Sequence, residues 1–372
     1  MLNKHARAMS FCTSCPKLCR FTCPVACSTG RETTSPWGRQ TLLHLAREGF
    51  RDFDYELGAL VYQCTTCLMC NRYCDHDIKV ADIMIAARAE AVSRQVAPDA
   101  VRTMRDAFTQ GCNPFGLDLG RVVTAATPED LLASDAEVVL FPGCTVIHDL
   151  PEILMDTISV LRGLEIDYAA VFQGDVQCCG EPLRQAGLRE QYQRHAETLF
   201  ARLRRHRLVI CACPACVYQF RVLYREMGLQ SSTRFLHVSE FLWEQRSRLD
   251  RAVRKRLPLR ACYHDPCYLG RYLGVYDEPR QVLAMVLEEP AAEFVWCRGD
   301  AACCGAGGGL SWSDPEAARR ITARRLEEFS DTGADELVTA CPTGVHAFRS
   351  ARPDGSVHDL VSIVARSLTG GE

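Results

Sequence analysis

The clearest chemistry in this sequence lies in its cysteines, and the stretch DVQCCGEPLRQAGL places two of them side by side as Cys178 and Cys179. Both thiolates could reach one zinc ion only through a strained ring, whereas neighbouring sulfurs can bind neighbouring irons of a multinuclear cluster. The next residue, Gly180, allows a positive φ or a close approach of the backbone to such a cluster. A vicinal redox disulfide is the alternative, and it would leave the other cysteines nearby unexplained.

The chain has 22 cysteines among 372 residues, and its N-terminus shows no export signal. In a reducing compartment clustered cysteines do not persist as disulfides, so they indicate metal ligands or redox groups. Apart from Cys112, they fall into four groups at positions 12, 15, 19, 23 and 27; 64, 67, 70 and 74; 144, 178, 179, 211, 213 and 216; and 262, 267, 297, 303, 304 and 341.

The second group, CTTCLMCNRYC, has the ligand spacing of a bacterial ferredoxin. The spacing Cys64-x2-Cys67-x2-Cys70-x3-Cys74 predicts a cubane 4Fe-4S cluster, in which the fourth cysteine serves the other cluster of a two-cluster module. Zinc is the alternative metal, but structural zinc sites mostly use separated pairs of ligands.

The first group, CTSCPKLCRFTCPVAC, repeats this pattern less regularly, with one spacer a residue longer. The crossover rule predicts one cluster on Cys12, Cys15, Cys19 and Cys74, and another on Cys64, Cys67, Cys70 and Cys23. In this assignment Cys27 is spare, or it replaces Cys23.

Two basic residues, Lys17 and Arg20, lie inside the first cysteine loop. Positive charge there would offset the charge of a thiolate-ligated cluster and raise its reduction potential. The alternative is that both side chains are solvated surface residues.

The segments around these loops predict helices. TTSPWGRQTLLHLAREG has a cap at Thr34 or Ser35, proline in the first turn and a terminating Gly49. IKVADIMIAARAEAVSR predicts another helix after the second loop. We therefore expect a helical two-cluster ferredoxin-like module at 9–95, followed by a linker helix and turn at 96–134.

The rest of the chain alternates strands with helices, which predicts parallel sheets. AEVVLFPGC predicts a strand that ends at Cys144, IDYAAVF predicts the next strand, and a third ends near Cys213. Ligands of such folds bind beyond the carboxyl ends of the strands. Matching cysteines recur at offsets of 123, 125 and 128 residues, which indicates an internal repeat that packs as a pseudo-twofold pair.

The composition excludes several other functions. Hydrophobic residues make up 47%, charged residues 24% and the formal net charge is -3, which favours a globular protein that binds no nucleic acid. No run approaches the roughly 18 apolar residues of a membrane span. We expect a cytoplasmic protein that reaches a membrane only through a partner.

The glycine-rich stretch CCGAGGGL resembles a phosphate cradle, but Leu310 stands where the dinucleotide fingerprint needs its third glycine. No phosphate-binding loop ending in GK[ST] is present either. The sequence therefore predicts no flavin or nicotinamide site in this chain, so that a partner must supply the two-electron chemistry.

The cysteine motifs of the chain resemble those of a known family. Cys144-x33-Cys178-Cys179-Gly180-x32-Cys213-Pro-x-Cys216 is similar to the cysteine-rich CCG domain, and YHDPCYLGRYLGVYDEPR followed by CCGAGGG is similar to a second copy. Two ferredoxin motifs ahead of two CCG domains resemble the catalytic iron–sulfur subunit of heterodisulfide reductase. The iron–sulfur subunits of anaerobic glycerol-3-phosphate dehydrogenase, glycolate oxidase and lactate utilisation systems are similar.

The resemblance implies a multidomain α+β and α/β fold, with pseudo-symmetric CCG domains of parallel strands at 135–250 and 256–372. In the first domain it implies a noncubane 4Fe-4S cluster on Cys144, Cys178, Cys179, Cys213 and Cys216. The second domain departs from the pattern, because Gly344 stands where the fifth cysteine would be. Its remaining residues would hold an ordinary 4Fe-4S cluster or a degenerate site: Cys267, Cys303, Cys304, Gly305 and Cys341.

Two functions follow from this resemblance. In the first, an electron-transfer subunit links a flavoprotein dehydrogenase or electron-transfer flavoprotein to an acceptor in a hetero-oligomeric complex of anaerobic metabolism. The alternative is a disulfide reductase that acts at Cys178 and Cys179, with His264 as a proton donor or a structural residue. A zinc-stabilised interaction protein without redox activity is the third hypothesis.

Overall fold

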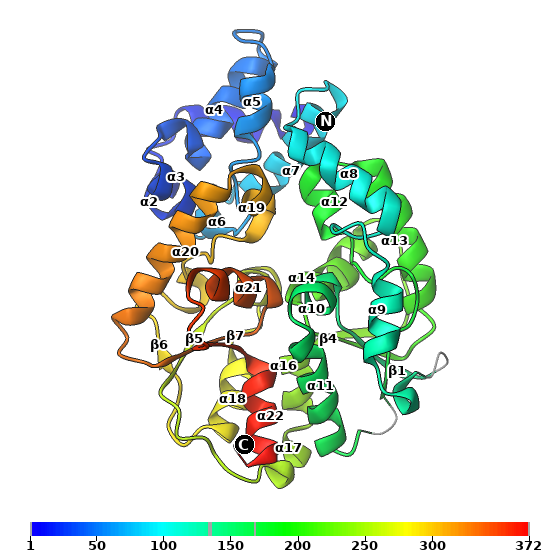
Figure 1. Ribbon diagram of the computed structural model, residues 1–372. Helices are drawn as coiled ribbons and strands as arrows, with labels where there is room; N and C mark the ends of the chain where they lie inside the picture. Colours follow the sequence, from blue (N-terminus) through cyan, green and yellow to red (C-terminus); the bar gives the residue numbers. More distant parts are fainter. Residues whose placement is uncertain (1, 133–135, 167–168, 371–372) are drawn as a thin grey trace. The chain divides into compact units, whose positions relative to one another are not determined.

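The computed structural model describes residues 2–132, 136–166 and 169–370 (Figure 1). The chain forms two compact units, each built from segments distant in sequence. The first comprises Met1–Asp106, Pro182–Tyr192 and Ala302–Leu326, and the second comprises Ala107–Glu181, Gln193–Ala301 and Glu327–Glu372. The N-terminal segment is thus joined by two short segments from the region of the vicinal cysteine motifs. The predicted boundaries 9–95, 96–134, 135–250 and 256–372 stay predictions.

The N-terminal part of the first unit is helical, as predicted. Helix α4 begins after the N-cap Ser35, whose Oγ accepts a hydrogen bond from the Gly38 amide at 2.9 Å, and Pro36 takes the first turn. The α-helices that lie entirely within this unit are α1 (Ala6–Thr13), α2 (Cys19–Thr22), α3 (Pro24–Thr29), α4 (Pro36–Arg47), α5 (Tyr55–Leu60), α6 (Met69–Arg72), α7 (Val80–Ser93) and α19 (Leu310–Ser313).

Four further helices contain a boundary between the units: α8 (Asp99–Gly111), α12 (Glu181–Ala186), α13 (Arg189–Leu203) and α20 (Pro315–Ser330). Shorter 3₁₀ turns are η1 (Leu2–His5), η2 (Glu32–Thr34), η3 (Glu129–Leu131), η6 (Arg298–Asp300) and η7 (Gly307–Gly309). Helix α8 agrees with the helix predicted for the linker.

The second unit contains two parallel sheets, as the alternating pattern predicted. The first has the order β2-β1-β3-β4 and the second the order β6-β5-β7-β8, so both place their strands in the same sequence. The strands are β1 (Val138–Phe141), β2 (Ala169–Val171), β3 (Leu208–Cys211), β4 (Arg234–His237), β5 (Ala261–His264), β6 (Ala292–Glu293), β7 (Glu336–Thr339) and β8 (Val357–Asp359). Residues 167–168 of the second predicted strand lie outside the described residues.

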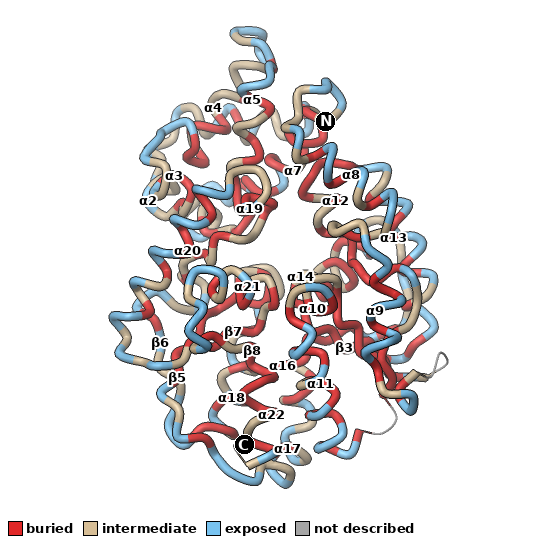
Figure 2. Tube along the Cα trace, in the orientation of Figure 1, coloured by how far each residue is buried: buried red, intermediate tan, exposed pale blue. Residues whose placement is uncertain are grey.

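Helices cover these sheets, and the strands and the inward faces of the helices together form the core of the second unit. The inner strands β1 and β3 are buried throughout (Figure 2), because parallel strands are covered on both faces. The helices are α9 (Leu119–Ala126), α10 (Cys144–Asp149), α11 (Pro151–Gly163), α14 (Pro214–Tyr218), α15 (Tyr224–Glu226), α16 (Val238–Glu244), α17 (Arg246–Ala252), α18 (Asp277–Val286), α21 (Pro342–Ala351) and α22 (Leu360–Thr369), with π-helical turns η4 (Gln219–Leu223) and η5 (Tyr268–Tyr272).

The two repeats pack on each other within this unit. Helix α11 of the first repeat contacts α22 of the second, and α16 contacts α18 (Figure 1). The end of α11 is close-packed, since a Cβ on Gly163 would lie 2.9 Å from a Leu368 methyl carbon. Within the described residues, no helix combines the length and the apolar character that crossing a membrane requires.

Candidate iron–sulfur sites

The ferredoxin-like cysteines form two groups of four in the first unit. In the first group, burial raises the pKa of Cys12 to about 12, and the nearby thiols of Cys19, Cys74 and Cys15 add to this effect. Burial likewise raises the pKa of Cys19 to about 11, and the thiols of Cys23, Cys15 and Cys74 add to this effect. The structure therefore brings together the four thiols that the crossover rule assigns to one cluster.

The second group contains Cys23 and the three closely spaced cysteines of the second loop. Burial raises the pKa of Cys70 well above its usual value, and the thiols of Cys67, Cys64 and Cys23 raise it further. All four side chains line one hollow, together with Arg39. This is the second set that the crossover rule predicts.

The chemistry of these donor sets fits 4Fe-4S clusters. Four thiolates are unfavourable in a buried site unless a cation neutralises them, and iron does so. Backbone amides donate to the sulfurs of three ligand candidates: Lys17 N to Cys15 at 3.4 Å, Thr66 N to Cys64 at 3.4 Å and Ile78 N to Cys74 at 3.4 Å. Such hydrogen bonds stabilise the negative charge of a reduced cluster.

The spare cysteine of the first loop lies elsewhere. Cys27 is exposed, and its thiol donates to the Phe21 carbonyl at 3.5 Å. Cys23 is the one that lies beside the second loop, where it lines one hollow with Cys64, Cys67 and Cys70. The geometry thus favours Cys23 over Cys27, although the ligand assignment stays a prediction.

The two basic residues predicted to tune a cluster both interact with Glu32. The Arg20 guanidinium pairs with this carboxylate, and Lys17 Nζ lies 3.7 Å from it. Lys17 also lies over the Trp37 ring, 4.5 Å from its centroid. Glu32 therefore offsets much of the charge that the two residues would present to a cluster.

Sequence reasoning missed two buried arginines near the second group. Arg39 is 1% exposed, and its Nη2 lies 3.8 Å from Cys23 Sγ. Arg88 is fully buried and donates to the Cys64 carbonyl at 2.7 Å. The sequence did contain one indication of a buried arginine, because Arg88 is a charged residue in the nearly all-apolar helix segment IMIAARAEAV.

The first repeat gathers its five predicted cysteines at the carboxyl ends of strands. Cys144 follows β1, Cys213 and Cys216 follow β3, and Cys178 and Cys179 precede α12. Their thiols shift one another's pKa, as close neighbours do, in the order Cys144, Cys178, Cys179, Cys216 and Cys213, and Cys341 of the second repeat acts on Cys213 in the same way. This array of soft donors fits a multinuclear iron–sulfur cluster.

Hydrogen bonds to the backbone position the vicinal pair. His195 Nε2 donates to the Cys178 carbonyl at 2.7 Å, and the Tyr224 hydroxyl donates to the Cys179 carbonyl at 3.1 Å. Burial lowers the pKa of His195, so its ring is neutral at pH 7. Gly180 has a φ of 80°, which agrees with the conformation expected after the two cysteines.

The residue after this glycine connects the two repeats. The buried Glu181 carboxyl accepts hydrogen bonds from the Gln219 amide and the Tyr268 hydroxyl, which lie on the π-helical turns η4 and η5. Such turns occur frequently at functional sites. The spacing of the cysteines contained no signal for this contact.

The second repeat is divided between the units. Cys303 and Cys304 belong to the first unit, and Cys267 and Cys341 belong to the second. Gly305 has a φ of 92°, and its amide donates to Cys303 Sγ at 3.3 Å. The contact of Cys341 with the first-repeat array was not predicted.

The predicted proton donor His264 lies at the end of β5 and is 2% exposed. Its ring packs edge-on against Phe348 and Phe294, at centroid distances of 5.0 and 6.1 Å. These contacts describe a core residue, and the catalytic role of His264 stays a prediction.

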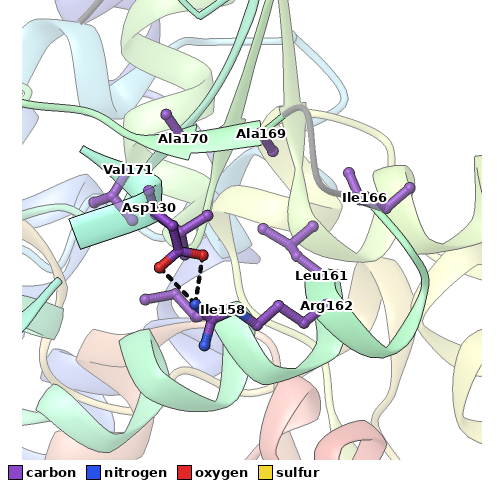
Figure 3. Close-up of a pocket in the computed structure, with 9 residues that line it drawn as sticks. Asp130, Ile158, Leu161, Arg162, Ile166, Ala169, Ala170 and Val171 are labelled. Atoms are coloured by element: carbon purple, nitrogen blue, oxygen red, sulfur yellow. Dashed lines mark hydrogen bonds and ion pairs between the residues drawn. The ribbon is translucent and has the colours of Figure 1, made fainter. Parts of the chain in front are cut away.

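A pocket beside β2 contains no cysteine (Figure 3). Its lining is mostly apolar, and the Arg162–Asp130 ion pair lies at its edge at 2.7 Å. Among the residues that the structure describes, no three His, Cys, Asp or Glu side chains form a ready-made site for a single metal ion.

Comparison with known proteins identifies the domains. Residues 138–221 and 261–349 match the cysteine-rich domain family (CCG), and residues 8–78 match the 4Fe-4S dicluster domain. The chain is therefore an iron–sulfur oxidoreductase subunit with one dicluster domain and two cysteine-rich domains, and iron–sulfur clusters are its cofactors.

Three relatives show which proteins share this organisation. A subunit of dihydromethanophenazine:CoB–CoM heterodisulfide reductase from Methanosarcina acetivorans is 29% identical, over 83% of this chain and 78% of its own length. A subunit of fumarate reductase (CoM/CoB) from Methanothermobacter marburgensis is 28% identical, over 87% and 65%. EtfAB:quinone oxidoreductase of Syntrophomonas wolfei is 27% identical, over 76% and 42%. The homologues are thus components of reductase-type redox systems.

Proposed function

We propose that this chain is an electron-transfer subunit that relays electrons between a flavoprotein partner and an acceptor. The observation that carries this proposal is the gathering of eight ferredoxin-type thiols into two groups of four within one unit. Two cubane 4Fe-4S clusters on these groups and a noncubane cluster on the first CCG domain would each accept and release single electrons.

The chain's own residues supply the environment for this chemistry. The thiolates would fix each cluster in place, and amide hydrogen bonds would stabilise the added negative charge. Burial would keep water from the sulfurs of Cys23, Cys64 and Cys67. Two side chains hold the backbone of the vicinal pair by hydrogen bonds to its carbonyls: His195 and Tyr224.

A flavoprotein dehydrogenase or an electron-transfer flavoprotein is the proposed partner. The Syntrophomonas wolfei relative is an EtfAB:quinone oxidoreductase, and the Methanosarcina acetivorans relative is one subunit of a heterodisulfide reductase. A hetero-oligomeric complex on the cytoplasmic side would join such a partner to this chain.

The second candidate is a disulfide reductase that acts at the first CCG site. The array of neighbouring thiols around Cys178 and Cys179 favours it, because a multinuclear cluster there could bind the two sulfurs that a disulfide releases on reduction. The heterodisulfide reductase relative supports the same candidate.

Iron, zinc and acid-labile sulfide per chain, measured on anaerobically purified protein, test the cofactors. About eight irons are expected for the two cubane clusters, and about four more for each loaded CCG domain. A total near twelve means that the second CCG domain is empty, and a total near sixteen means that it is loaded. Zinc without sulfide contradicts both proposals.

Oxidation of the dithionite-reduced protein separates the two functions. The electron-transfer proposal expects rapid oxidation by an oxidised flavoprotein and no reaction with disulfides. The reductase alternative expects oxidation by a disulfide, and both Cys178→Ser and Cys179→Ser should abolish that reaction.

A further inference from the structure

The glycine-rich turn after the second CCG motif contacts the backbone of the second ferredoxin loop. A Cβ on Gly308 would lie 2.2 Å from the Cys64 carbonyl oxygen, and one on Gly307 would lie 2.8 Å from that of Thr65. Gly308 also has a φ of 64°. The glycines therefore permit a close backbone contact, which accounts for the glycine-rich stretch without a phosphate-binding role.

The buried side chain of Arg88 stabilises this contact by hydrogen bonds. Its Nη2 donates to the Cys64 carbonyl at 2.7 Å, and its Nη1 donates to the Gly308 carbonyl at 2.8 Å. Its Nε donates to the Val61 carbonyl at 3.0 Å. One buried guanidinium thus binds the ferredoxin loop and the turn together.

The segment after the first CCG motif reaches the same arginine. Arg88 Nη1 donates to Gln185 Oε1 at 2.7 Å, and Gln185 Nε2 donates to Thr66 Oγ1 at 3.1 Å. The Tyr62 hydroxyl donates to the Ala186 carbonyl at 2.9 Å. Gly187 leaves no room for a Cβ, which would lie 2.6 Å from the Arg88 carbonyl carbon.

Charge distinguishes the two groups of ferredoxin thiols. The buried Arg39 and Arg88 both lie beside the group that includes Cys23 and Cys64. The basic residues of the other group are paired with Glu32 and partly exposed. Buried positive charge stabilises a reduced cluster more than screened charge does. A cluster held by the Cys23–Cys64 group should therefore have the higher reduction potential.

We propose that Arg88 and the Cys64–Thr66 loop form the electron exit of the ferredoxin-like module. Arg88 would favour reduction of a cluster held by the adjacent thiolates, and it holds the loop against the segments that lead from the two CCG motifs. This inference rests on the proposed electron-transfer function. Each transfer oxidises the donor by one electron and reduces the acceptor by one, without breaking a bond, and two transfers account for the two electrons of a reduced flavin in the partner.

A potentiometric titration of the full chain, followed by electron paramagnetic resonance, tests whether the charge of Arg88 raises the reduction potential of one cubane cluster. Arg88→Met should shift the midpoint potential of one cubane signal downward and leave the other in place, and Arg88→Lys should restore most of the shift. Arg260→Met is the matched control, because Arg260 is exposed and pairs with Asp335 at 2.8 Å. Equal potentials in Arg88→Met and wild type would overturn the proposal.

Gly308→Ala tests the contact without removing the charge, and it decides the question if Arg88→Met does not fold. After rapid mixing with dithionite, Gly308→Ala should reduce its cubane clusters at the wild-type rate and its CCG cluster at least tenfold more slowly. Gly355→Ala is the matched control, since Gly355 has a φ of 86° and open space around it. Equal rates in the two alanine variants contradict the exit, whereas a wild-type chain without reducible clusters contradicts the electron-transfer function itself.

Discussion

At the scale of single residues, some glycines are required by their backbone conformation, whereas another could carry a side chain. Gly180 and Gly305 have positive φ values of 80° and 92°, so their conformation requires glycine. Gly344 lies in α21, and a Cβ there would approach no closer than 3.5 Å to Thr339. The missing fifth cysteine of the second repeat therefore has room for a side chain.

Restoring that cysteine should restore a ligand set. In Gly344→Cys, the segment from Cys341 would have the spacing of Cys213-Pro-x-Cys216. We expect more iron per chain in Gly344→Cys than in its control Gly344→Ala, by up to about four irons. Identical iron and sulfide contents in the two variants would show that the second repeat gains no cluster from a fifth cysteine.

A buried carboxyl makes stability depend on pH. Asp359 is 1% exposed, and its Oδ1 accepts from the Val361 amide at 2.9 Å, while its Oδ2 has no hydrogen-bond partner among the described residues. Burial raises the pKa of Asp359 to about 7. The folded state therefore holds the proton more tightly than the unfolded state, so this stabilisation is complete below the unfolded pKa of about 4 and is lost as the pH rises to 7.

Asp359→Asn keeps the hydrogen-bond acceptor at the start of α22 and removes the titration. Its unfolding free energy should fall less than that of wild type between pH 5 and 8, by a difference on the order of a few kcal/mol. Urea unfolding at several pH values measures this difference. Parallel pH profiles for the two proteins would refute the assignment.

At the scale of elements, two helices deliver the arginines to the second thiol group. Helix α4 buries Pro36, Arg39 and Leu43 on one side, so its arginine lies where an apolar residue is usual. Helix α7 is buried on nearly all sides, and Arg88 is satisfied there by backbone carbonyls. Each helix therefore packs in the core of the unit and also places an arginine beside the second thiol group.

Weakening α4 should loosen this thiol group. Ser35→Ala removes the N-cap hydrogen bond to Gly38 and should lower stability by about 1 kcal/mol. We also expect faster iron release to a chelator, because α4 carries Arg39. Asp118→Ala, which removes the cap of α9, is a control of similar cost. Iron release that rises equally in both variants would point to general destabilisation.

At the scale of the whole molecule, the chain places cysteines from distant segments in common sites. Cys74 follows the second loop but lies with Cys12 and Cys19 of the first. The two units are likewise assembled from separated segments. Ligand sets thus follow the tertiary structure instead of sequence proximity.

Paired substitutions reveal these sets. Cys12→Ser and Cys74→Ser should each remove the same cubane signal and about four irons, and the double variant should lose no more. Cys70→Ser should remove the other signal, so that its combination with Cys74→Ser loses about eight irons. Iron analysis and electron paramagnetic resonance measure both results. If Cys70→Ser and Cys74→Ser remove the same cluster, the crossover assignment is wrong.

The sequence by itself determined the helices around the cysteine loops, the parallel strands and the repeated cysteine motifs. These features depend on local periodicity and short spacings, which can be read directly from the chain. Only the tertiary structure placed Arg39 and Arg88 beside one thiol group, Cys341 beside Cys213, and Gly308 on the Cys64 carbonyl. Such contacts join residues far apart in sequence, and a buried charge becomes favourable only when packing supplies its distant partners.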